Sequence, residues 1–195
     1  MDQRETLRLL VEASSAKLRR AVAGVPGELF GQRPGPGLNP IGFIYFHILR
    51  SWDEDLNVLS QGRQPEEDTW HRAGFSDTLD YEPLGLGAGG RGVGVGFRDE
   101  EVDAVPKRPD VLARYHDLLD EKTGSFFEAV TSDDFILERE SGLAHRHLGP
   151  YTPARLWGMV ILHHAEHSGD IKFVKGMLGM PDPTYPGARS QSRSR

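Results

Sequence analysis

The stretch that decides the fold is residues 162–171, Leu-His-His-Ala-Glu-His-Ser-Gly-Asp-Ile, which holds three of the eight histidines of the chain. Its flanks predict one long helix. Thr152 is a good N-cap and Pro153 suits the first helical position. The glycines at 176–179, followed by Pro181, predict its end.

Two of these histidines share a helix face. His163 and His167 lie one turn apart, so both imidazoles can reach one cation, whereas His164 diverges from His163 by roughly 100°. Positions three and four apart through His163 and His167 are mostly apolar, while the row through His164 turns polar towards its end. The apolar row consists of Leu156, Val160, Ile171, Val174 and Leu178. The pattern therefore predicts that His163 and His167 point inward.

An inward pair of imidazoles needs hydrogen-bond or metal partners, because burying an unpaired polar group is costly. A divalent metal would serve both rings. The alternative is that each ring is a core histidine bonded to a backbone carbonyl or a carboxylate. A third ligand from a neighbouring helix would favour the metal.

Composition narrows the possible functions. The 195 residues are enough for one domain with a hydrophobic core. The net charge of −6 does not favour nucleic-acid binding, since phosphate-backbone binders carry a basic surface. Cysteine is absent, so a metal would be held by His, Asp or Glu. Neither an apolar signal core nor a membrane-length apolar run is present, and we expect a soluble, cytoplasmic protein without a membrane partner.

Three further helices are predicted by their apolar period. The first covers residues 2–25, the second runs from Ile41 to about Gln61, and the third opens at 109–110 and ends at 133–134. His47 lies among large apolar residues of the second helix and is expected to face the core or a neighbouring helix. The predicted fold is all-α, a four-helix bundle with a long crossover connection between helices two and three.

That connection, residues 62–108, has no sustained helical period. Its aromatic residues predict that the first part packs, and the glycine-rich run at 84–96 predicts that the second part moves. Gly85, Gly87 and Gly90 match the spacing GxGxxG. No convincing strand precedes them and no helix follows, which argues against a dinucleotide site.

Two motifs resemble the DinB-like (YfiT-like) metal-binding proteins. They are Asn-Pro-Ile-Gly-Phe-Ile-Tyr-Phe-His at 39–47 and His-x-x-Glu-His-x-Gly-x-Ile at 163–171. The helix order and the long second connection agree with that family over roughly residues 5–180. The resemblance implies that residues 1–180 form one four-helix bundle, and residues 181–195 are expected to be a disordered tail.

The resemblance also implies a divalent metal, zinc or nickel, on His47, His163 and His167, and a homodimer. Relatives such as mycothiol-dependent maleylpyruvate isomerase and bacillithiol S-transferases use the metal to bind a low-molecular-weight thiol as a thiolate. A metal-dependent transferase or isomerase acting on a small-molecule substrate with such a thiol is therefore expected. Neither the substrate nor a catalytic residue is indicated.

Two alternatives remain open. The first is a non-enzymatic, dimeric metal-binding or stress-response interaction protein. The second is a metal-dependent hydrolase, in which residues 163–167 would form an HxxEH motif with Glu166 as the general base. On a helix Glu166 is expected to point away from His163 and His167, whereas Asp170 could orient a ligand. His116 and Tyr45 are weaker candidates.

Overall fold

The structure is a computed structural model and describes residues 2–140 and 149–180. Within these ranges the chain forms helices and no strand, apart from an isolated β-bridge between Arg139 and Tyr151. The all-α prediction is confirmed. No helix in the described part is long and apolar enough to cross a membrane. The predicted tail, 181–195, lies outside the described residues.

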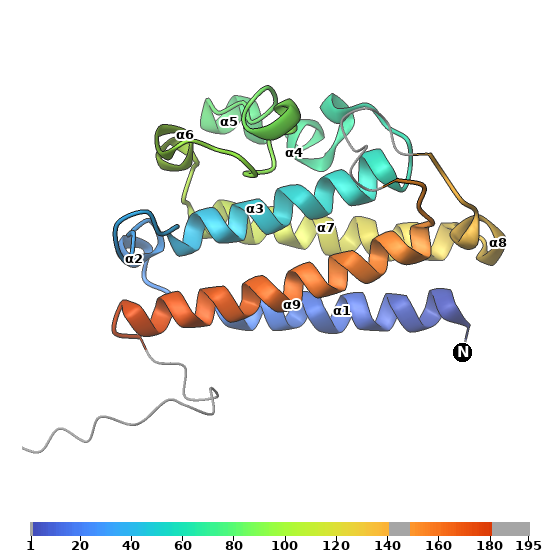
Figure 1. The fold of residues 1–195 in the computed structure, drawn as a ribbon, viewed down its shortest axis with the longest axis horizontal. Helices are drawn as coiled ribbons and strands as arrows, with labels where there is room; N and C mark the ends of the chain where they lie inside the picture. Colours follow the sequence, from blue (N-terminus) through green and yellow to red (C-terminus); the bar gives the residue numbers. More distant parts are fainter. Residues whose placement is uncertain (1, 141–148, 181–195) are drawn as a thin grey trace, which may run out of the picture.

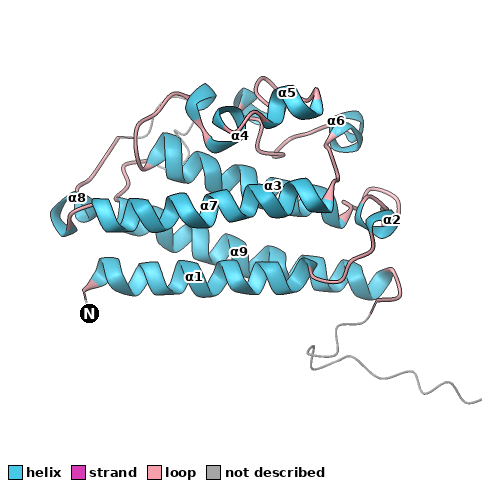
Figure 2. Cartoon of the chain, turned by 180° about the vertical axis from the view of Figure 1, so that it is seen from behind, coloured by secondary structure: helices cyan, strands magenta, loops and turns pink. Residues whose placement is uncertain are grey.

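Four long helices lie side by side (Figures 1 and 2). They are α1 (Gln3–Val22), α3 (Ile41–Glu54), α7 (Pro109–Ala129) and α9 (Pro153–Met177). Each corresponds to a predicted helix. α1 contacts α9 and α7, and α3 contacts the same two helices, so the four enclose a common core.

The ends of these helices differ in detail from the predictions. α3 begins after Pro40 and passes at its end into a π-helical turn, Asp55–Leu59. α7 stops at Ala129, because the Thr131 side chain accepts a hydrogen bond from the Asp134 amide and caps a separate short helix. The short helices are α2 (Gly27–Phe30), α4 (Thr69–Arg72), α5 (Phe75–Leu79), α6 (Asp99–Ala104), α8 (Ser132–Ile136) and two 3-10 turns, Pro65–Glu67 and Ala88–Gly90.

The direction of the helices explains the long connection. α3 and α7 run the same way, so the chain must return along their length before α7 can start (Figure 1). It does so through α4, α5 and α6, which lie over one side of α3 and α7 (Figures 1 and 2). The α1 to α3 link needs no such return, since these two helices are antiparallel.

A buried polar cluster fastens this connection to the long helices. The Arg50 guanidinium of α3 is 1% exposed and lies 2.6 Å from the Asp68 carboxylate. Asp53, fully buried one turn further on, accepts hydrogen bonds from the Tyr115 hydroxyl at 2.6 Å and from the Thr69 backbone amide at 3.0 Å. α3, α7 and the start of α4 are therefore joined through charged groups held away from water.

We predict that Arg50→Met destabilises the chain by about 3–5 kcal/mol, because it leaves the Asp68 and Asp53 carboxylates buried without their cation. The free energy of unfolding is measured with urea. The matched control is Arg72→Met, which removes the exposed ion pair with Glu67 and should change stability little. Equal stability of the two variants would contradict the role assigned to Arg50.

Candidate metal centre

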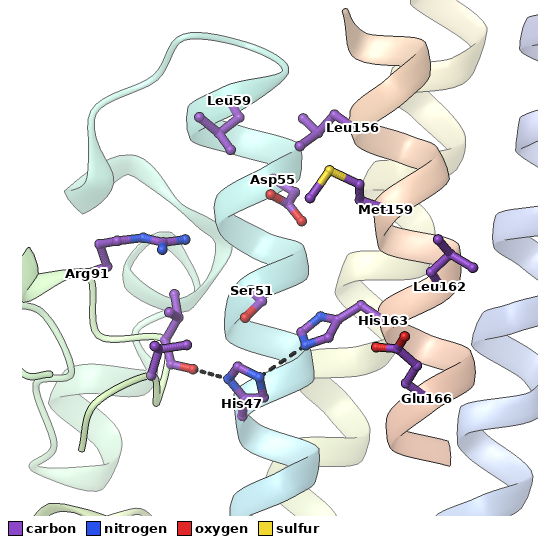
Figure 3. A pocket seen from close by; sticks show the side chains of 12 residues that line it. His47, Ser51, Asp55, Leu59, Arg91, Leu156, Met159, Leu162, His163 and Glu166 are labelled. Carbon is purple, nitrogen blue, oxygen red and sulfur yellow. Dashed lines mark hydrogen bonds between the residues drawn. The ribbon is translucent and has the colours of Figure 1, made fainter. Parts of the chain in front are cut away.

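Three imidazole rings meet between α3 and α9. His47 comes from α3 and His163 and His167 come from α9, and one nitrogen of each lies within 4.8 Å of the others. The Nε2 atoms of His47 and His163 are 3.1 Å apart and face each other (Figure 3). The structure thus brings together all three residues that the resemblance indicated.

The connection sets the orientation of the His47 ring. Its Nδ1 donates a hydrogen bond to the backbone carbonyl of Val93, which is buried within the glycine-rich run. That run is itself held to α3, since the Arg50 Nε donates to the Gly92 carbonyl at 3.4 Å and Arg91 pairs with Glu54. The glycine-rich part of the connection is therefore packed against the site, and its carbonyl directs Nε2 of His47 towards α9.

Gly92 permits close packing within the connection, where the glycine-rich run meets Pro83. Its φ is +67°, in the left-handed region that favours glycine, and a Cβ there would lie 2.4 Å from the Pro83 carbonyl oxygen. Gly85 has a φ of +88° but no atom within 4 Å of a Cβ position. The close contact with the Pro83 carbonyl, in addition to the positive φ, distinguishes Gly92 from Gly85.

His47 and His163 have the protonation that metal ligands need. Burial lowers the pKa of His47 to about 4 and that of His163 to about 3. Both rings are therefore neutral at pH 7, and the Val93 carbonyl keeps the proton of His47 on Nδ1, leaving a lone pair on Nε2. The Nδ1 of His167 likewise donates to the Asp170 carboxylate at 2.7 Å. Ligating histidines commonly have such oxygen partners on their second nitrogen.

The spacing of the nitrogens suits one small cation. Zn–N bonds of about 2.0–2.1 Å at tetrahedral angles put two nitrogens about 3.3 Å apart. The 3.1 Å between the Nε2 atoms of His47 and His163 is close to that value. Among the described residues, His47, His163 and His167 thus form a donor set that fits zinc.

A cavity of about 380 Å³ opens beside His47 and His163. One wall is a row on α3 and its π-helical turn, and the other is α9 (Figure 3). The lining residues are His47, Ser51, Asp55, Leu59, Arg91, Val93, Val95, Leu156, Met159, Leu162, His163 and Glu166. A ligand in this cavity would lie next to two of the three imidazoles.

Two predictions about α9 need correction. Glu166 lines the cavity on the same side as His163 and does not point away from it (Figure 3). The second prediction is that His163 and His167, and not His164, point inward. His164 and Ser168 are in fact fully buried, whereas His163 and His167 are only half-buried. The reason is that α9 packs against α1 as well as α3, so two of its rows face other helices.

The weaker candidates belong to the core. The Tyr45 hydroxyl and His116 Nδ1 are 2.7 Å apart, and His116 Nε2 lies 2.7 Å from the Ser15 hydroxyl. Neither Tyr45 nor His116 joins the three-histidine cluster.

Sequence reasoning missed several residues of the site. Ser51 and Asp55 follow His47 at intervals of four and could have been found from that spacing. Val93 contributes its backbone carbonyl, so the identity of its side chain gives no indication of this role. Arg91 reaches the cavity from the connection, and no local pattern marks it.

The fold and the cluster define an all-α protein with a three-histidine site between two of its long helices. A family model for the DinB superfamily matches residues 10–171, and the chain belongs to that superfamily. A solved structure of a conserved protein from Enterococcus faecalis is similar, with a TM-score of 0.70 over 92% of this chain and 99% of that chain at 13% identity. At this identity the similarity shows the fold alone. Comparison of the sequence with curated proteins found no match.

The buried histidine His164 provides a test of the packing on α9. Its Nδ1 donates to the Ser14 hydroxyl at 3.0 Å, its Nε2 has no hydrogen-bond partner, and burial lowers its pKa to about 3 from 6.5. The unfolded chain takes up this proton near pH 6.5 and the folded chain only near pH 3. The stability contribution is therefore complete above pH 6.5 and is lost progressively as the pH falls below it.

We predict that His164→Leu makes stability less dependent on pH between 6 and 4, by about 1.4 kcal/mol per pH unit. Urea unfolding of the metal-free protein at several pH values measures this slope for wild type and variant. An unchanged slope would mean that His164 takes up its proton equally well in the folded chain.

Proposed function

We propose that this DinB superfamily protein binds a divalent metal, zinc or nickel, on His47, His163 and His167. The observation that carries the proposal is the meeting of three imidazoles from two helices, two of them with Nε2 atoms 3.1 Å apart. Hydrogen bonds from the Nδ1 atoms of His47 and His167 to oxygen acceptors further support it. A purely structural role for three half-buried histidines would not require their nitrogens to converge.

We further propose that the site is catalytic and that it serves a transferase or isomerase using a low-molecular-weight thiol. Three protein nitrogens leave coordination positions open, and a divalent metal there would stabilise a bound thiolate or polarise a carbonyl. The chain has no cysteine, so the thiol would come from a second molecule. The cavity beside His47 and His163 offers room for the small-molecule substrate.

A second candidate is metal-dependent hydrolysis, favoured by one observation. Glu166 lines the cavity together with His163, where its carboxylate could take a proton from a water molecule (Figure 3). A non-enzymatic metal-binding protein is the third possibility. The open cavity supports the two enzymatic proposals over this one.

We also propose that the chain forms a homodimer through α9. Leu162, Phe173 and Met177 are 62%, 69% and 46% exposed and, with Met159, follow one row of that helix. Pairing of such rows across a two-fold axis would remove apolar surface from water.

We predict that His47→Ala weakens zinc binding more than about 100-fold, because removing a ligand should cost more than the 10–100-fold typical of an outer partner. Zinc affinity is measured by competition with a chromophoric chelator, and metal content by elemental analysis. His71→Asn, which alters a histidine paired with Asp68 and Glu82, is the control and should retain metal. Equal metal in the His47 variant would exclude that residue as a ligand.

The same samples separate catalytic from structural metal. Zinc in a structural site stabilises the fold outright, so its removal by a chelator should unfold the chain. We expect the chelated protein to keep its helical circular dichroism, because the four long helices share an apolar core independent of the cluster. Unfolding on chelation would support the non-enzymatic reading.

The connection yields a separate prediction. Gly92→Ala should shift the Val93 carbonyl away from His47 and weaken zinc binding by about 10-fold, as for other outer-shell changes. Gly85→Ala is the matched control, because it shares the positive φ without the close contact. Equal zinc affinity of the two variants would show that the Val93 carbonyl does not support the site.

A further inference from the structure

The cavity beside His47 and His163 has a second polar group, Asp55, further along its α3 wall. His47, Ser51 and Asp55 share one face of α3 and its π-helical turn, and Asp55 lies eight positions beyond His47, which is about 12 Å along the helix axis. The rest of the lining is mainly apolar, with the charged side chains of Arg91 and Glu166 as exceptions; its apolar residues are Leu59, Val93, Val95, Leu156, Met159 and Leu162. Figure 3 shows His47 and His163 at one end of the drawn residues, Asp55 further along α3, and Leu59 and Leu156 beyond Asp55.

Asp55 is an unusual residue for such a wall. It opens the π-helical turn, a rare geometry that is frequent at functional sites. Its half-buried carboxyl group makes no hydrogen bond to the part of the chain that the structure describes. A carboxyl group in this position has hydrogen-bonding capacity that a ligand in the cavity could use.

The surroundings of Asp55 favour its uncharged form. Burial raises the pKa of the Asp55 carboxyl well above its ordinary value, and the neighbouring Glu54 carboxylate raises it further. The Arg91 guanidinium opposes this effect, but it already pairs with Glu54, with an Nε to Oε1 distance of 2.9 Å. A protonated carboxyl group is a hydrogen-bond donor and carries no charge that would attract a cation.

We propose that the cavity binds an elongated small molecule whose anionic head reaches the metal and whose uncharged far end accepts a hydrogen bond from Asp55. This inference rests on the proposed metal site and adds the chemical class of its ligand. An imidazole binds a metal in its uncharged form, so three imidazole ligands would leave the positive charge of a divalent cation uncompensated, which favours an anionic head. The apolar walls favour a hydrocarbon body.

The test uses the full chain loaded with zinc and a set of hydroxamic acids, whose heads bind zinc as anions. Each probe carries about six to eight methylene groups, enough with its two end groups to cover the roughly 12 Å between His47 and Asp55. The chains end in a primary amide, a methyl group or an ammonium group. Affinities are measured by isothermal titration calorimetry.

The amide probe is expected to bind roughly 3- to 10-fold more tightly than the methyl probe, which is the usual effect of one net hydrogen bond. The ammonium probe is expected to bind more weakly than either, because the far end offers it no anion and the cost of dehydrating its charge is not recovered. Tightest binding of the ammonium probe would show an ionised Asp55 and overturn the proposal.

Variants assign the effect to Asp55. Asp55→Asn should keep the preference for the amide probe, because its side-chain amide still donates a hydrogen bond, whereas Asp55→Leu should abolish it. Asp133→Asn, an exposed change on α8, is the control and should behave as wild type. A preference that persists in Asp55→Leu would overturn the assignment.

Failure of the ligand proposal can be distinguished from failure of the metal site. If zinc binds but no hydroxamate binds, or the amide and methyl probes bind equally, the ligand proposal is wrong and the metal site stands. If zinc itself does not bind, the metal site and the ligand proposal are both wrong.

Discussion

The buried charge of Arg50 is the constraint on which the rest of the structure depends. A guanidinium removed from water must be paired, and Arg50 meets this need with Asp68 from the connection and with the Gly92 carbonyl from its glycine-rich part. One side chain of α3 therefore fixes both halves of a long segment. The same contacts place the Val93 carbonyl against His47, so a core interaction also determines how the site is oriented.

This arrangement gives the glycine-rich run a function that its composition conceals. Glycines usually suggest mobility, yet Gly92 is required here because a backbone carbonyl lies where a side chain would begin. The run approaches α3 closely enough to hydrogen-bond an imidazole and to line a cavity. The connection is thus part of the site as well as the return path between parallel helices.

The four long helices and the three histidines could be predicted from the sequence, because capping residues, helical periodicity and the spacing of His163 and His167 are local signals. The depth to which each side chain of α9 is buried could not be predicted from the sequence. Its second buried row, with His164 and Ser168, depends on packing against α1, about 150 residues earlier in the chain. The placement of Glu166 in the cavity and of the Val93 carbonyl on His47 likewise follows from tertiary contacts that leave no sequence pattern.

The pairing of α1 with α9 joins the two ends of the described chain, and this has a consequence for how the molecule forms during synthesis. Contacts between distant segments are slow to establish, and a growing chain exposes its N-terminal part first. Until α9 leaves the ribosome, α1 and α3 lack one of the two long helices against which they pack, and two of the three imidazoles have not yet joined the folded part. The histidine cluster is therefore completed last, so a chain that presents it has already closed its core.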